Sequence, residues 1–301
     1  SGSPSSVTSR SWPPWPPTPR WWLRYEKVIR RAAGMGRAAT ESDADRYEHR
    51  YAHCDVLVIG GGVAGLAAAR SAAADGARVI LCDENPSLGG GVQDRAAMID
   101  EQPASAWVAA TTRELAACPD VVMLARTTAF GYYDGNLVGA LERVADHLAV
   151  PPPFAPRQRL WKIRAKSVVL ASGALERSIA YANNDLPGTM LAAAAGTYVR
   201  RYGVKPGDRA VVFTNHDGAY GDALALHDAG VAIAAIVDAR PQAMLASALP
   251  QRARAAGLAI LADSVVAGAS GKRHVRAVDV RPMAGGAATR IDRDLVCVSG
   301  G

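Results

Sequence analysis

The chain has 301 residues, 49% of them hydrophobic and 21% charged, which is the composition of a folded globular protein with one large or two ordinary domains. No apolar run reaches the roughly 18 residues that a membrane-spanning helix needs, and no signal-peptide segment is present, so we expect a cytoplasmic protein without a membrane partner. The four cysteines lack CxxC spacing and form no cluster with histidines, which excludes a disulfide framework and predicts no metal site.

The formal net charge of +6 lies entirely in the first forty residues. Residues 1–40 hold seven of the 34 basic residues and one of the 28 acids, so the remaining 261 residues carry 27 of each. A nucleic-acid-binding fold spreads its basic residues over the folded body. We therefore expect no nucleic-acid partner.

The beginning of the chain has an unusual composition. Residues 1–22 are rich in proline and tryptophan, and proline removes backbone donors and fixes φ, so we expect an extended, non-helical stretch. Its tryptophans favour packing on a partner, and the alternative is a solvated tail. Residues 23–39 predict a short basic helix, and residues 40–51 predict a polar lead-in.

The pattern changes at residue 55. DVLVIG (55–60) is a short apolar run typical of a strand buried on both faces of a parallel sheet. A glycine-rich turn leads into an alanine-rich helix that ends at Gly76, and ARVILCDE (77–84) predicts a second buried strand. Further strands are predicted at 121–127, 159–165 and 167–173, with a loop at 151–156.

A weaker copy of this unit follows later in the chain. Residues 209–214 predict a strand, 218–229 a helix and 231–239 another strand. A helix near 241–256, strands within 258–271 and 275–282, and a last strand at 295–301 complete the prediction. This alternation predicts an α/β fold with a doubly wound parallel sheet.

The glycine-rich turn matches the dinucleotide fingerprint GxGxxG. Gly60 permits the tight turn, Gly62 lets the backbone approach a diphosphate, and Gly65 lets the helix pack closely on the strand. The helix N-terminus supplies unpaired N–H groups and a partial positive charge, which suits a diphosphate. The complete strand–turn–helix context makes a glycine turn without a ligand the less favoured interpretation.

Acidic residues follow the second strand, where they can accept hydrogen bonds from ribose hydroxyls. Asp83 and Glu84 would repel a 2′-phosphate, so the site favours NAD or the adenosine half of FAD over NADP. The loop that ends at Gly91 carries paired glycines that let it pass near the diphosphate. SVVLASGA (167–174), with Gly173, is similar to the second fingerprint of two-dinucleotide-domain flavoprotein folds.

The second copy of the unit is degenerate. Asp217 stands where a phosphate would approach, although Asp238 ends its second strand as a ribose acceptor would. The second domain therefore either binds a second nucleotide or is a retained scaffold. No nucleophile–base pair and no redox CxxC motif is present, so no catalytic residue is assigned.

Several segments closely resemble the alpha subunit of heterotetrameric sarcosine oxidases, from about residue 24 to residue 301. The most specific of them are FGYYD (130–134), GALER (173–177) and NNDLPG (183–188), which are not general features of dinucleotide-binding folds. Related opine and cyanide-forming oxidase subunits fit these segments less well.

The resemblance implies a glutathione-reductase-like FAD/NAD(P)-binding fold with an inserted second Rossmann-like domain. It also implies a subunit of a multi-flavin oxidoreductase acting on the CH–NH group of sarcosine with oxygen as acceptor. Such enzymes yield glycine and peroxide and pass the one-carbon unit to tetrahydrofolate or release formaldehyde. The family carries the amine-oxidising FAD in the beta subunit, FMN at the alpha–beta interface, and NAD with a structural role in the first site of the alpha subunit.

By the same resemblance, the NAD contacts are Ala64 with its glycine turn, Asp83, Glu84 and Asn85 at the ribose, the Gly91 loop, and Phe130 near the adenine. The implied partners are a beta-type flavin-bearing subunit together with the other subunits of a hetero-oligomer.

The expected domains are an extension at 1–50, a first dinucleotide-binding domain at 51–200, a second, degenerate Rossmann-like domain at 201–293, and the start of a return to the first domain at 294–301. Family alpha subunits are much longer, with a ferredoxin-like region before these residues and a folate-binding domain after them, so we expect a fragment that is inactive alone.

Three alternatives stay open. They are a stand-alone flavoprotein with FAD in the first site and NAD(P)H in the second, an opine or amine dehydrogenase subunit, and a nucleotide-free scaffold.

Overall fold

The computed structural model describes residues 19–36, 40–94 and 97–301, and it divides into two compact units, the second of which is Arg46–Gly301. The first unit contains helix α1 (Pro19–Ala32), which begins before the predicted helix at 23–39. The expectation that residues up to 22 are non-helical is therefore wrong for 19–22, because a proline at the first helical position lacks only an N–H that has no intrahelical partner. The rest of the Pro/Trp-rich stretch lies outside the described residues.

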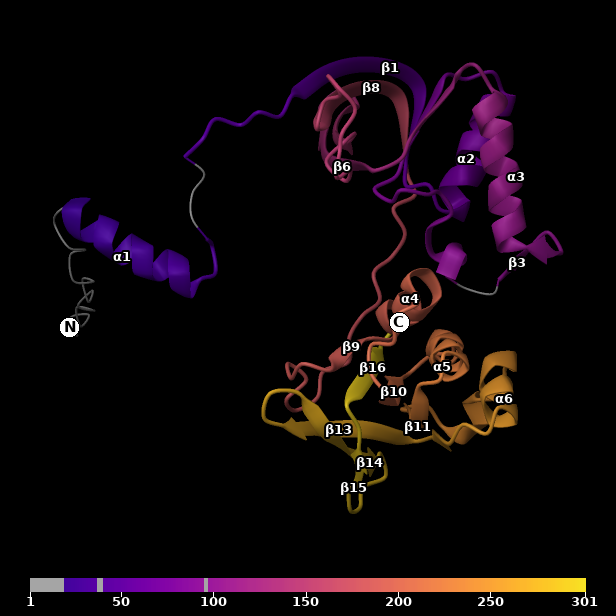
Figure 1. The fold of residues 1–301 in the computed structure, drawn as a ribbon. Coiled ribbons are helices and arrows are strands. Elements are labelled where there is room, and N and C mark those ends of the chain that lie inside the picture. The colour runs from indigo at the N-terminus through magenta and orange to yellow at the C-terminus, as the bar shows by residue number, and fades with distance from the viewer. Residues whose placement is uncertain (1–18, 37–39, 95–96) are drawn as a thin grey trace, which may run out of the picture. The chain divides into compact units, whose positions relative to one another are not determined.

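A six-stranded sheet forms the first part of the second unit, in the order β5-β2-β1-β8-β7-β6. Strands β5, β2, β1 and β8 run parallel, and β7 runs antiparallel to both of its neighbours, β8 and β6. Helices α2 and α3 pack on one face of the parallel part (Figure 1). The strands and helices are β1 (Tyr47–Ile59), α2 (Val63–Ala74), β2 (Val79–Cys82), α3 (Ala104–Ala117), β5 (Val121–Leu124), β6 (Thr127–Tyr133), β7 (Leu137–Arg143) and β8 (Gln158–Leu170).

Strands β1 and β8 are longer than predicted and pair along their whole length. Residues from Tyr47 onward, expected to be a polar lead-in, are strand because they pair with residues 158–165 of β8. Glu48 accepts a hydrogen bond from Arg159 Nε at 2.6 Å across this pair. Arg159 Nη1 also donates to Glu142 Oε2 of β7 at 2.8 Å. This charged ladder joins three strands and fixes their register.

A second, parallel sheet has the order β12-β11-β10-β16-β9. Helices α4, α5 and α6 pack on one face of it, and a three-stranded antiparallel sheet of β13, β14 and β15 packs on the other. These elements are β9 (Thr189–Leu191), α4 (Ala192–Tyr202), β10 (Arg209–Thr214), α5 (Gly218–Asp228), β11 (Ala232–Asp238), α6 (Ala248–Ala255), β12 (Ile260–Leu261), β13 (Ser264–Gly271), β14 (Val275–Pro282), β15 (Thr289–Asp292) and β16 (Leu295–Ser299).

Short elements complete the described chain: η1 (Gly90–Asp94), β3 (Met98–Ile99), β4 (Gln102–Pro103) and η2 (Gln242–Met244). In the ranges that the structure describes, no helix is both long and apolar enough to cross a bilayer.

The predicted α/β architecture with parallel sheets is confirmed. The predicted domain boundaries stay a prediction. Two strands that these boundaries place outside the second domain pair within the second sheet. One is β9, which falls within the expected first domain, and the other is β16, which falls within the expected return segment. Beyond β16, the Gly300 N–H donates to the Arg177 carbonyl at 2.7 Å, so the last residues lie beside the segment that follows β8.

Candidate functional site

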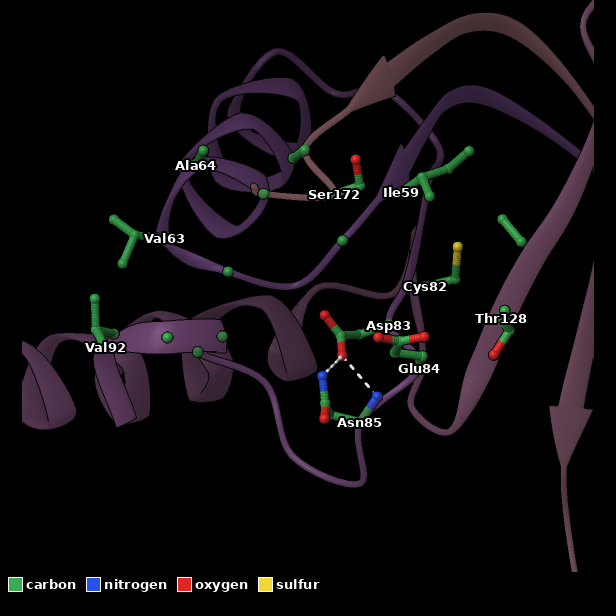
Figure 2. A pocket seen from close by; sticks show the side chains of 18 of the residues that line it. Ile59, Val63, Ala64, Cys82, Asp83, Glu84, Asn85, Val92, Thr128 and Ser172 are labelled. Atoms are coloured by element: carbon green, nitrogen blue, oxygen red, sulfur yellow. Dashed lines mark hydrogen bonds between the residues drawn. The ribbon is translucent and has the colours of Figure 1, made fainter. Parts of the chain in front are cut away.

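A cavity of about 650 Å³ lies where β1, β2 and β8 end (Figure 2). Ligands of open parallel sheets bind at this edge, outside the carboxyl ends of the strands. Most of the predicted site residues line the cavity: Gly60, Gly62, Ala64, Asp83, Glu84, Asn85, Gly91 and Gly173. The structure therefore brings together residues that are far apart in the sequence.

Two predicted site residues are not among those that line the cavity. Gly65 is buried in α2, where a Cβ would overlap the carbonyl oxygen of Gly60, so its role is close packing. Phe130 is 57% exposed, and its ring packs over Gly139. The cavity wall on that strand is formed instead by residues 127–129.

The glycines of the turn have different roles. Gly60 has a φ of +104°, and a Cβ there would overlap the carbonyl of Ala171, so the fold itself requires glycine. Gly62 has a φ of −70°, which any residue adopts, and the nearest atom to a Cβ there is Gly90 Cα at 4.0 Å. The space beside Gly62 is thus open to a ligand, and the fold does not require glycine at this position.

The structure also requires a glycine that the fingerprint leaves unspecified. A Cβ on Gly61 would come within 2.5 Å of the Leu88 side chain. The Gly61 carbonyl accepts from the Gly89 N–H at 2.7 Å, and Gly62 forms a bridge with Gly89. The paired-glycine loop therefore lies directly against the turn. The signal for Gly61 was its place in a run of three glycines.

Asp83 is a buried carboxylate held from two sides. The Gly61 N–H donates to Oδ2 at 2.6 Å. The main-chain N–H and Nδ2 of Asn85 donate to Oδ1 at 2.8 and 3.0 Å (Figure 2). A carboxylate has about four acceptor sites, so capacity remains for a ligand hydroxyl. Asn85, predicted at the ribose, orients Asp83. Glu84 is exposed, and its main-chain carbonyl accepts from Arg143.

The cavity therefore combines two features that suit different ends of one ligand. The first turn of α2 begins at Val63 and presents N–H groups without intrahelical partners, together with the positive end of the helix dipole. Asp83 supplies a fixed negative acceptor on the neighbouring strand. A molecule with an anionic centre and adjacent hydroxyls fits this arrangement.

Cys82 also lines the cavity, but it is not a nucleophile. Burial raises the pKa of its thiol to about 11, and burial likewise raises the pKa of Cys54 to about 11. A protonated, buried thiol is unreactive. Within the described ranges no group of His, Cys, Asp and Glu side chains is arranged to hold a metal ion.

The corresponding position in the second sheet is filled by protein side chains. Asp238 is fully buried, and its two oxygens accept from the Tyr220 hydroxyl and from three groups of Arg240. Arg240 Nη2 also lies 2.8 Å from Asp217 Oδ1. These contacts occupy the carboxylate that a ribose would need.

His216 follows β10 and is bound within the fold. Its Nδ1 accepts from the Gly218 N–H at 3.1 Å, which leaves Nε2 to donate to Ser299 Oγ at 2.6 Å. The Ser299 hydroxyl in turn donates to Glu176. Because the serine lies between the histidine and the carboxylate, the chain is not a nucleophile–base–acid arrangement.

Comparison with known proteins shows which proteins this chain resembles. Residues 55–128 match the model of the FAD dependent oxidoreductases. The chain is 45% identical over 285 residues to the sarcosine oxidase alpha subunit of Rhizobium meliloti (strain 1021), covering 95% of this chain and 28% of that protein. It is 42% identical to the sarcosine oxidase alpha subunit of Corynebacterium sp. (strain P-1), covering 89% of this chain and 28% of that protein.

A further sequence match is less similar, and solved structures share the fold. An opine oxidase subunit of Agrobacterium tumefaciens (strain Ach5) is 31% identical over 61% of this chain and 36% of its own length. Thioredoxin reductase from T. acidophilum superposes with a TM-score of 0.61 at 18% identity, covering 83% of this chain and 77% of that one. L-proline dehydrogenase from P. horikoshii has a TM-score of 0.59 at 20% identity, covering 88% and 45%.

The chain spans 28% of the length of the sarcosine oxidase subunits that it matches. Over that segment it is a homologue of the sarcosine oxidase alpha subunits, and it has the FAD-dependent oxidoreductase fold.

Proposed function

We propose that the chain is the NAD-binding part of an alpha subunit in an oxidoreductase of the sarcosine oxidase type. The observation that carries the proposal is the cavity at the strand ends, where open space beside Gly62 adjoins the fixed carboxylate of Asp83. The resemblance to sarcosine oxidase alpha subunits implies that the dinucleotide in this site is NAD. The carboxylates of Asp83 and Glu84 disfavour a ligand with a 2′-phosphate.

The residues of the cavity divide the work of binding. The first-turn N–H groups of α2 bind the diphosphate, and Gly62 allows it to approach the backbone. Asp83 accepts from the adenosine ribose, with Gly61 and Asn85 fixing its orientation. The bound NAD stabilises the fold and takes no part in hydride transfer. The chain itself therefore supplies no catalytic residue.

Catalysis belongs to the assembled enzyme. In the proposed complex, a beta-type subunit carries the FAD that oxidises the N-methyl group of sarcosine, and FMN lies at the interface of the two subunits. Oxygen is the final acceptor, and the one-carbon unit passes to tetrahydrofolate or leaves as formaldehyde. The four cysteines are free thiols, which suits a cytoplasmic enzyme. The chain alone is expected to be inactive.

The match to FAD-dependent oxidoreductases supports a second candidate, in which FAD occupies the first cavity and NAD(P)H the second sheet. The contacts of Asp238 with Tyr220 and Arg240 count against the second half of that scheme, because a nucleotide ribose would have to displace them. The first half of that scheme differs from our proposal only in which dinucleotide the first cavity binds.

A sarcosine-dependent peroxide assay tests the proposed reaction. The chain is expressed with and without a beta-type subunit, and peroxide formation is followed after sarcosine is added. We expect peroxide from the co-expressed pair and none from the chain alone. Activity of the chain alone would favour the stand-alone flavoprotein, and no activity of a properly assembled pair would refute the assigned reaction.

A further inference from the structure

Part of the first sheet carries an exposed aromatic surface. The surface comes from the first half of β1, from β6 and from β8, and we define this aromatic face as Tyr47, His49, Tyr51, His53, Phe130, Tyr133, Lys162 and Arg164. Its tyrosine and phenylalanine side chains are between 53% and 71% exposed. Where one face of an antiparallel sheet packs on the core, the outward positions are normally polar, so an aromatic face of this kind points to an interaction site.

Strand pairing gathers these residues on one side of the sheet. The four members from β1 occupy alternate positions, so they project from the same side. Residues directly opposite each other on neighbouring strands share a face of the sheet. Two such rows of facing residues can be followed from β1 through β8 and β7 to β6. The first row is Tyr51, Lys162, Gly139 and Gly131, and the second is His53, Arg164, Leu137 and Tyr133.

Two of the aromatic rings pack over glycines. A Cβ on Gly139 would come within 2.7 Å of Phe130 Cζ, and one on Gly131 would overlap the ring of Tyr133. The rings therefore lie against the backbone. An ordered aromatic side chain loses little conformational entropy when a partner covers it.

The aromatic face is also cationic. Lys162 Nζ lies 5.3 Å from the centroid of the Tyr51 ring, and Arg164 Nη1 donates to the Gly135 carbonyl at 2.8 Å. Every residue of 47–53, 128–133, 137–143 and 158–164 is described, and none of their outward positions holds Asp or Glu. The face lacks negative charge of its own.

We infer that the aromatic face is the docking surface for the flavin-bearing subunit, on a patch of that subunit where Asp and Glu surround an apolar centre. The inference rests on the proposed function, which supplies the partner. Charge complementarity requires an acidic patch, and aromatic and arginine side chains are enriched at interface centres. Cationic aromatic sheets also bind single-stranded nucleic acid. However, residues 41–301 carry 27 basic and 27 acidic residues, and this balance favours a protein partner.

The test measures binding of the full chain to the purified beta-type subunit from the same organism, by isothermal titration calorimetry. The variant Tyr51→Glu/Lys162→Glu reverses the character of the first row. The control Tyr202→Glu/Arg252→Glu makes the same change in formal charge at exposed residues of α4 and α6. We expect the first variant to bind about tenfold more weakly or worse, and the control to bind like the wild type. Circular dichroism and dinucleotide content should match the wild type in both.

Each contrary outcome has a separate meaning. Wild-type binding that the Tyr51→Glu/Lys162→Glu variant retains would overturn the docking surface and leave the proposed function intact. Failure of the wild-type chain to bind would overturn the proposed partner and the docking surface together. A labelled single-stranded oligonucleotide that binds the wild type and not the variant would assign the face to nucleic acid instead.

Discussion

Replacing Gly62 with valine separates ligand binding from folding. The backbone of Gly62 has φ −70° and ψ −176°, which valine adopts without strain, and only Gly90 Cα lies as near as 4.0 Å to the new Cβ. We therefore expect the free energy of unfolding to change by less than about 1 kcal/mol. The valine side chain instead fills space that the diphosphate needs.

The expected loss of affinity follows from the contacts that the diphosphate loses. If one or two charge-assisted hydrogen bonds to the first turn of α2 are broken, at about 1.5–3 kcal/mol each, affinity falls by about ten- to ten-thousandfold. Calorimetric titration with NAD measures the affinity, and urea unfolding measures stability. Gly221→Val is the matched control, because Gly221 has no neighbour within 4 Å of a new Cβ and lies in α5.

The result that refutes this reasoning is unchanged NAD affinity in a folded Gly62→Val protein, which would place the diphosphate elsewhere. Loss of folding in that variant would instead show that the space beside Gly62 is not free.

Three other substitutions test the site and the fold. Asn85→Ala removes one side-chain donor to the Asp83 carboxylate, so NAD affinity should fall by about fivefold with little change in stability. An NAD affinity equal to that of the wild type, measured by titration, would refute the positioning role of Asn85. The pKa of Asp55 is held well below its usual range by hydrogen bonds from Arg78 and Lys166, so its stabilising effect is complete at neutral pH and is lost as the pH falls below about 4. Asp55→Asn should therefore lower the Tm at pH 7 and flatten its fall in acid, whereas parallel Tm–pH curves would contradict the pairing. Arg240→Met leaves the buried Asp238 carboxylate without its cation and should destabilise the protein by about 3–5 kcal/mol in urea, and a cost below about 1 kcal/mol would mean that the pair is not buried.

The sequence predicted best where local geometry and function coincide. A tight turn, a close helix–strand approach and an acid at the next strand end each demand particular residue types, so Gly60, Gly65 and Asp83 were recognisable individually. The same residues predicted the order strand, helix, strand that β1, α2 and β2 have.

Features that depend on partners distant in the sequence were not predicted. The first half of β1 reads as polar, and it is a strand because it pairs in register with the first half of β8, more than 100 residues later in the chain. The β6–β7 hairpin is a local feature that was also not predicted, although Gly135 and Asn136 adopt the positive φ values of 64° and 53° that such turns favour. The direction of the Arg240 side chain, which fills the second site, also depends on tertiary packing.

The nucleotide content of the purified chain tests the central claim most directly. The protein is denatured, and its supernatant is analysed by mass spectrometry beside an absorption spectrum of the native sample. We predict stoichiometric NAD and no flavin absorbance. Stoichiometric FAD, or no dinucleotide at all, would contradict the assignment of NAD to the cavity beside Gly62.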